Sequence, residues 1–280
     1  MEGSDAIIIT AAVFLSISLA AVSLRCYVRL GIVKAFGHDD ALMVAATIFN
    51  IGFATCGIVG AVYGMGKTPV YLAHHQEDLR RGLLIPRGKC WWLGQVLYVF
   101  TCTIARLSIA TTLLRLTIHR THSYILYGVV TFSTAVGIVF LFFTIFQCHP
   151  VTYYWNHYPE TGHCLGINIL LGIVYMYSGM AATCDIILGS LPILIIWRLQ
   201  MDRRTKCAVS GILGIAGIAS AAVIVRIPFL HHAKDPDFLY ATTQISIWSN
   251  VEANLGITAG SLVTVRPFLR VFATHNSCVQ

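Results

Sequence analysis

Three charged side chains lie within long apolar stretches of the sequence: Arg106, Asp185 and Glu252. An ionisable group inside a membrane is unfavourable unless it is paired or hydrated, so such groups mark ion pairs, ligand sites or proton paths. An arginine can hold carboxylates, and a buried carboxylate can bind a cation or supply a proton. With a rise of about 1.5 Å per residue, each of the three lies roughly 20 to 25 Å from the predicted outer end of its helix. They share a depth and could meet.

Three interpretations of this trio stay open. The first is a buried ion pair that fixes how the helices align, with Asn250 or Asn254 satisfying the remaining polar groups. The second is a ligand or substrate pocket in which Asp185 or Glu252 binds a cation or supplies a proton. The third is a proton-relay or transport path. A further intramembrane charge, Arg226, falls near the outer end of its helix and can reach the interface.

The composition requires a membrane around these residues. Of the 280 residues, 56% are hydrophobic and only 11% are charged, and the mean hydropathy is +0.73. A soluble fold of this size carries about 25% charged residues, and a disordered chain has far fewer aliphatic ones. The net charge of +7 comes from short basic clusters between apolar runs, where they act as topology signals. We therefore exclude a soluble domain, intrinsic disorder and a nucleic-acid partner, and expect the lipid bilayer as the surroundings.

The helices that position the trio are predicted from seven mostly apolar runs, each long enough to cross a bilayer. These runs cover residues 6–27, 41–63, 91–116, 124–146, 168–197, 207–230 and 239–265. The fold class is thus an all-α integral membrane protein, a bundle of seven transmembrane helices. We expect one domain over residues 1–280, with a short cytoplasmic tail at 266–280.

Basic residues between the runs predict the orientation, because Lys and Arg are retained in the cytoplasm. Most of them fall on the inner side if the N-terminus is outside, so we predict N-out and C-in. The loop with Arg203, Arg204 and Lys206 is then the main cytoplasmic contact surface. Asp39 and Asp40 open the second helix, where acids accept free N–H groups; we expect an inner-face cap, or alternatively a lock with that basic loop.

Three cysteines fall on the predicted outer side, where disulfides can form: Cys90, Cys148 and Cys164. We favour Cys148 with Cys164 because they close a short loop, and Cys90 is the competing partner of Cys164. No His, Cys or acidic cluster has metal-ligand spacing, so we expect no metal site.

Several short strings resemble the fungal rhodopsin-domain integral membrane proteins, which include the satratoxin-cluster membrane protein family and receptor-like seven-helix proteins of plant-pathogenic fungi. The similarity covers residues 25–269 and rests on the order and spacing of its strings. They are Arg25-Cys-Tyr-Val-Arg29, Asp39-Asp40, Gly64-Met-Gly66, Arg106-Leu-Ser108, Leu114-Arg115-Leu116, Cys148-His-Pro150 with Trp155 and Cys164, Asp185 with Pro192 and Trp197, Arg226, Trp248-Ser-Asn-Val-Glu252 and Arg266-Pro267.

The sequence departs from the family pattern at three places. Thr68 stands where the family usually has His, Arg106 where it commonly has Lys, and Gly37 with His38 where an aromatic residue is usual. Retinal chemistry, which the family name suggests, needs a lysine deep in a helix for the Schiff base. The lysines here lie in predicted loops or at helix ends, so we expect no retinal and no other cofactor.

The topology and the resemblance together predict a receptor-like sensor in the plasma membrane or an endomembrane. It would bind a small lipophilic ligand between its helices and pass the change to its cytoplasmic loops, with a heterotrimeric G protein as candidate partner.

The alternative is a membrane-embedded enzyme of secondary metabolism, a cyclase or isomerase acting on a lipophilic substrate. Asp185 or Glu252 would then be the catalytic acid, and Trp248 would stabilise a carbocation. No nucleophile–base arrangement supports this alternative independently.

Overall fold

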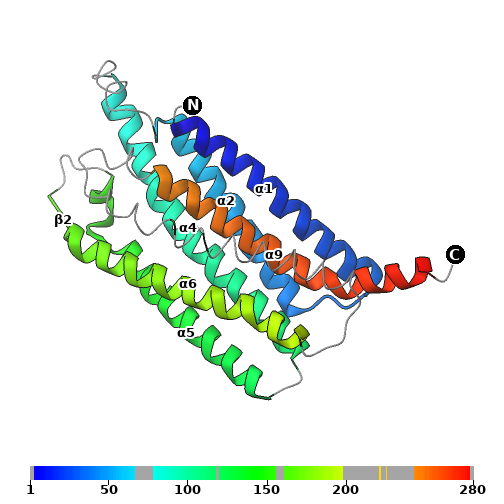
Figure 1. Ribbon diagram of the computed structural model, residues 1–280. Helices are drawn as coiled ribbons and strands as arrows, with labels where there is room; N and C mark the ends of the chain where they lie inside the picture. Colours follow the sequence, from blue (N-terminus) through cyan, green and yellow to red (C-terminus); the bar gives the residue numbers. More distant parts are fainter. Residues whose placement is uncertain are drawn as a thin grey trace.

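The computed structural model describes residues 3–66, 78–117, 120–155, 161–197, 221, 225 and 243–277. Six long helices dominate these ranges (Figure 1): α1 (Gly3–Tyr27), α2 (His38–Val62), α4 (Asp78–Leu116), α5 (Arg120–Ile145), α6 (Ile167–Trp197) and α9 (Thr243–Ser277). A π-helical turn, η1 (Val28–Ile32), extends α1. Two-residue strands β1 (Cys148–His149) and β2 (His163–Cys164) and a short 3-10 helix, η2 (Val151–Tyr154), lie between α5 and α6.

Five of the described helical segments are long and apolar enough to cross a membrane: Gly3–Ile32, His38–Val62, Gly88–Arg115, Arg120–Ile145 and Ile167–Leu191. The fold is therefore all-α with several membrane-length helices. The predicted seventh span, 239–265, overlaps α9 from Thr243 onward, and its first four residues lie outside the described ones. The predicted sixth span at 207–230 lies outside the described residues except for Ala221 and Val225.

Two helices extend beyond the apolar runs from which they were predicted. α4 begins at Asp78 rather than at residue 91, and α9 continues to Ser277, so most of the predicted tail is helical. A charged residue ends an apolar run without interrupting the backbone hydrogen bonds of a helix, so hydropathy underestimates helix length at an interface.

Small residues allow close contacts between α2, α4 and α9. A Cβ atom added to Gly52 would lie 3.2 Å from the Leu97 side chain of α4, and one added to Gly94 of α4 would lie 3.7 Å from Cys56. A Cβ atom at Gly260 of α9 would come within 2.8 Å of Met43 of α2 and closer still to Ile109 of α4. Such contacts bring helix backbones together where lipid supplies no hydrophobic drive.

The turn after α2 explains the Gly64-Met-Gly66 string. Gly64 and Gly66 have φ angles of +92° and +85°, which side chains rarely adopt. A Cβ atom at Gly66 would also lie 2.9 Å from the backbone nitrogen of Ser4. The turn therefore needs glycine both for its conformation and because it lies directly against the start of α1.

A disulfide joins Cys148 to Cys164, which face each other across the antiparallel pair of β1 and β2. The bond connects the end of α5 to the start of α6. Cys90 is a free thiol. Tyr154 lies between the two bonded cysteines, outside the membrane-length helices, and burial raises the pKa of its hydroxyl.

Candidate functional site

Arg106, Asp185 and Glu252 meet in the interior of the bundle, one each from α4, α6 and α9. Arg106 donates from Nε to Asp185 Oδ1 at 2.7 Å and from Nη2 to Asp185 Oδ2 at 3.0 Å, a two-pronged pairing. Nη2 also reaches Glu252 Oε1 at 3.4 Å. The two-pronged geometry fixes the orientation of both side chains as well as their distance. The trio therefore ties three helices together at one depth.

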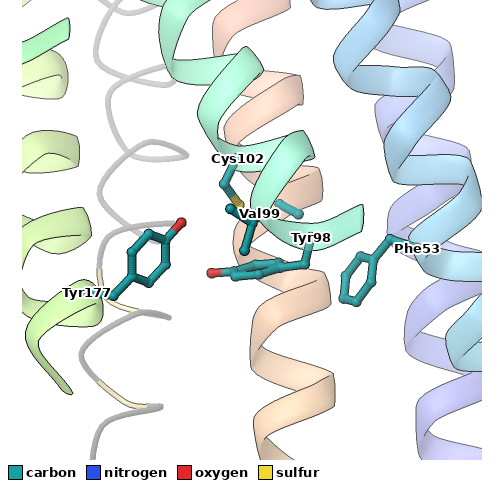
Figure 2. Packing of buried hydrophobic residues seen from close by; sticks show 6 residues of the cluster. Phe53, Tyr98, Val99, Cys102 and Tyr177 are labelled. Carbon is teal, nitrogen blue, oxygen red and sulfur yellow. The ribbon is translucent and has the colours of Figure 1, made fainter. Parts of the chain in front are cut away.

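Tyr98 is a fourth member that the sequence analysis missed. Its hydroxyl donates to Glu252 Oε2 at 2.7 Å, so the two oxygens of that carboxylate contact different partners, both on α4. The ring packs against Phe53 of α2, with centroids 5.6 Å apart (Figure 2). Tyr98 precedes Arg106 by about two helical turns, which places both on one side of α4.

An apolar cavity of about 140 Å³ lies beside Tyr98, between α2, α4, α5, α6 and α9. Phe53, Phe140 and Tyr177 form part of its wall, and Gln147, the residue before the disulfide, lines it as well. The cavity thus lies toward the end of the bundle that carries the disulfide. The described residues that line it include no charged side chain.

The predicted acids Asp185 and Glu252 do not line this cavity; Tyr98 lies between it and Glu252. Trp248 is half-buried and is not among the described lining residues either. The structure therefore separates the charged trio from the apolar wall instead of exposing a carboxylate on it.

Asn250 belongs to a different network, centred on Asn254. Asn254 Nδ2 donates to Asn250 Oδ1 at 2.9 Å, while Asn254 Oδ1 accepts from Ser18 Oγ at 2.7 Å and from Asn50 Nδ2 at 2.8 Å. Ser18, Asn50 and Asn254 are fully buried. One amide thus joins α1, α2 and α9.

A second charged cluster lies where α1 ends and α2 begins. Arg25 of α1 donates from Nε to Asp40 Oδ1 at 2.7 Å and from Nη2 to Asp39 Oδ2 at 3.0 Å, and all three side chains are buried. Arg115 at the end of α4 contacts Asp39 Oδ1 at 2.6 Å, and Arg29 lies 3.7 Å from Asp39 Oδ2. Three arginines therefore surround two carboxylates.

This cluster adds buried ion pairs to the helix cap expected of Asp39 and Asp40. Asp40 Oδ2 does accept the Gly37 N–H at 3.0 Å, as a cap would, but both carboxylates are buried and are held mainly by Arg25. Arg25 also donates to the Gly260 carbonyl of α9 at 2.9 Å. The alternative partners Arg203, Arg204 and Lys206 lie outside the described residues.

Glycine is needed at position 37 for the contact between Arg115 and Asp39. A Cβ atom added to Gly37 would collide with the Arg115 guanidinium and lie 2.6 Å from Asp39 Oδ1. The guanidinium thus lies directly over the glycine.

The described ranges contain no group of three or more His, Cys, Asp or Glu side chains placed to hold a metal ion.

Membrane-length helices with paired charges between them define an integral membrane protein of the multi-pass class. Within that class, residues 24–271 match the sequence model of the fungal rhodopsin domain family, and the chain belongs to this family.

Similar curated proteins are also fungal. The chain is 28% identical over 207 residues to a SAT4 family membrane protein of Emericella nidulans, covering 72% of this chain and 50% of that protein. It is 26% identical over 242 residues to the fugralins biosynthesis cluster protein 2 of Gibberella zeae, covering 83% and 58%. It is 24% identical over 269 residues to the wortmanamides biosynthesis cluster protein C of Talaromyces wortmannii, covering 95% and 70%.

The chain thus spans little more than half the length of the first two of these relatives. No solved structure matches it.

Proposed function

We propose that this chain is a receptor-like sensor of seven transmembrane helices, N-out and C-in, without retinal, that binds a small lipophilic ligand between its helices. The hydrogen bond from Tyr98 to Glu252 carries the proposal, because one residue both lines the apolar cavity and contacts the buried charges. A ligand that contacts the Tyr98 ring would therefore affect the hydrogen bond between α4, which carries Tyr98, and α9, which carries Glu252.

The helices of the trio also continue to the second cluster, which gives a route for a conformational change. α4 carries Arg106 and, farther along, Thr112 and Arg115; α9 carries Glu252 and Gly260. Arg25 contacts Thr112 at 3.3 Å and the Gly260 carbonyl at 2.9 Å. A ligand that favours a different spacing of α4 and α9 would shift the population of states at both clusters.

The basic residues at this second end support the proposed orientation. Arg25, Arg29 and Arg115 lie at the end of the bundle away from the disulfide, and retained basic residues favour the cytoplasm. The cavity is then nearer the outer face. The basic loop of Arg203, Arg204 and Lys206 is the proposed cytoplasmic contact surface, with a heterotrimeric G protein as the proposed partner, in the plasma membrane or an endomembrane.

A second candidate function is that of a membrane-embedded enzyme of secondary metabolism. Two of the similar fungal proteins are biosynthesis cluster proteins by name. In this chain a substrate in the cavity would meet the side chains of Tyr98, hydrogen-bonded to Glu252, and Tyr177, in place of the carboxylates expected from sequence.

A comparative metabolite profile of a strain without the gene distinguishes the two candidates. The sensor predicts that no lipophilic precursor accumulates, and that a strain carrying Glu252→Gln behaves like the deletion in signalling while keeping the parental profile. Loss of a product with accumulation of its precursor, in both the deletion and Tyr98→Phe strains, would overturn the sensor in favour of the enzyme.

A further inference from the structure

The wall of the cavity described above includes a buried tyrosine hydroxyl that donates no hydrogen bond to the described residues. Tyr177 of α6 lines the cavity and is only 4% exposed, and its ring stacks on Phe140 of α5 with centroids 4.1 Å apart. Among the described residues its hydroxyl finds no hydrogen-bond acceptor, while its oxygen faces the Arg106 guanidinium. A buried O–H without an acceptor is unfavourable, so a bound molecule that supplies an acceptor gains that contribution.

The surroundings of Tyr177 select a donor role for its hydroxyl. The Arg106 guanidinium lies close enough to interact electrostatically with the phenol oxygen, which favours lone pairs toward Arg106 and the proton toward the cavity. The hydroxyls of Tyr98 and Tyr177 point into the same space between α4 and α6 (Figure 2). The Tyr98 proton is engaged by Glu252, so of the two tyrosines Tyr177 is the one whose proton is available to a ligand.

The walls of the cavity set the charge of that ligand. The described lining residues are apolar or neutral, and transferring an ion among them without a partner charge is strongly unfavourable. The volume of about 140 Å³ is close to that of a cavity known to hold one benzene molecule, about 150 Å³. The part of the ligand held here is therefore about one ring in size.

We propose that the cavity binds an uncharged lipophilic molecule through a ring-sized group with one hydrogen-bond acceptor, a carbonyl or hydroxyl oxygen, which accepts from Tyr177. This inference rests on the proposed sensor function and deepens it, since it names the ligand class. Hydrocarbon chains of lipids lack the acceptor, and fatty-acid carboxylates carry the excluded charge.

Three probes of similar size test the proposal: 4-fluoroacetophenone, which has an acceptor; 4-fluoroethylbenzene, which has none; and 4-fluorobenzoate, which is charged. Binding to the purified full chain in lipid nanodiscs is measured by fluorine NMR. Wild-type protein should bind the ketone about three- to tenfold more tightly than the hydrocarbon after correction for partition into empty nanodiscs, as expected for one neutral hydrogen bond. The benzoate should not bind.

The variant Tyr177→Phe should reduce the ratio of the two neutral affinities to about one while leaving the hydrocarbon bound. Tyr175→Phe is the matched control, because Tyr175 lies on the same helix and is not among the described lining residues. It should keep the wild-type ratio. The wild-type ratio alone decides the proposal if Tyr177→Phe does not fold.

The outcomes separate this inference from the function on which it rests. Equal binding of ketone and hydrocarbon, or an unchanged ratio in folded Tyr177→Phe, overturns the hydrogen bond between Tyr177 and a ligand acceptor. The cavity then remains a site for an apolar ligand. Preferred binding of the benzoate overturns the uncharged class. Failure of all three probes to bind overturns both the ligand class and the cavity as the sensor's site.

Discussion

The hydroxyl of Tyr98 and the carboxylate of Glu252 form a 2.7 Å hydrogen bond between α4 and α9, and both residues are buried. The bond connects an aromatic side chain of the cavity wall to an acid that also contacts Arg106. A variant that lacks the Tyr98 hydroxyl but keeps its ring therefore tests this hydrogen bond separately from the packing of the ring.

Tyr98→Phe removes only the donor to Glu252. The ring still packs on Phe53, but one buried carboxylate oxygen loses its partner, so the free energy of unfolding should fall by about 1–3 kcal/mol. Thermal unfolding in one fixed detergent measures this loss. Tyr124→Phe is the control because Tyr124 is 73% exposed, and it should leave the unfolding temperature unchanged. An equal unfolding temperature for Tyr98→Phe and wild type would contradict the assigned hydrogen bond.

Arg106→Gln should be the most damaging single change in the trio. It leaves Asp185 and Glu252 without their cation, and breaking a buried ion pair costs about 3–5 kcal/mol, toward the lower value here because Asp185 is partly exposed. Arg106→Lys keeps the charge but loses the two-pronged geometry, so its folded yield should lie between those of Gln and wild type. Size-exclusion chromatography with a fluorescent fusion compares the yields. A Lys variant as poor as Gln would show that geometry, not charge, matters most.

The second cluster predicts unequal effects for two arginines. Arg25→Gln should sharply lower folded yield because it leaves two buried acids without their main donor. Arg115→Gln should cost only about 0–1 kcal/mol because Arg115 is close to half exposed. Parallel expression of the two variants checks the contrast, and equal losses would mean that the exposed pair is as strongly coupled as the buried one.

Gly37→Ala should act through Arg115. The new methyl group displaces the guanidinium, whose far end can move at little energetic expense, so the ion pair with Asp39 is lost while the fold is kept. In a double-mutant cycle, Gly37→Ala combined with Arg115→Gln should be no less stable than the worse single variant. Strictly additive losses would argue that Gly37 serves the backbone instead.

Mixing the purified protein with all-trans-retinal should give no visible absorption band. Of the lysines in the described ranges, Lys34 follows η1 and Lys89 lies near the start of a membrane-length segment, so neither is deep inside a helix. A band that borohydride abolishes would contradict this expectation.

Charges within apolar runs were the most informative signal in the sequence. Arg106, Asp185 and Glu252 were predicted to share a depth because helix rise converts residue number into depth. Arg25 and Asp39 were not paired in advance, because charges at helix ends also serve as topology signals and caps, and only the tertiary fold decides between these roles.

Tyr98 and Tyr177 were missed for a different reason. Aromatic residues are common in membrane helices, and no spacing along the chain marks the two whose hydroxyls approach a buried charge. The long helices and the Cys148–Cys164 pairing depend on local length and loop size, which sequence reports directly. The part of α4 that precedes its apolar run could not be predicted in this way, because charged residues interrupt the apolar pattern while the helix continues through them.

The placement of Asn254 has a consequence for biogenesis. Its side chain completes hydrogen bonds of Ser18 and Asn50, and its neighbours Glu252 and Gly260 complete contacts of Tyr98 and Arg25. α9 follows the other described helices in the chain, so each of these earlier groups emerges from the ribosome before its partner exists. The pairs of Arg106 with Asp185 and of Arg25 with Asp40 can form before α9 inserts. Until it does, Ser18, Asn50 and Tyr98 lie in the unfinished bundle without these partners.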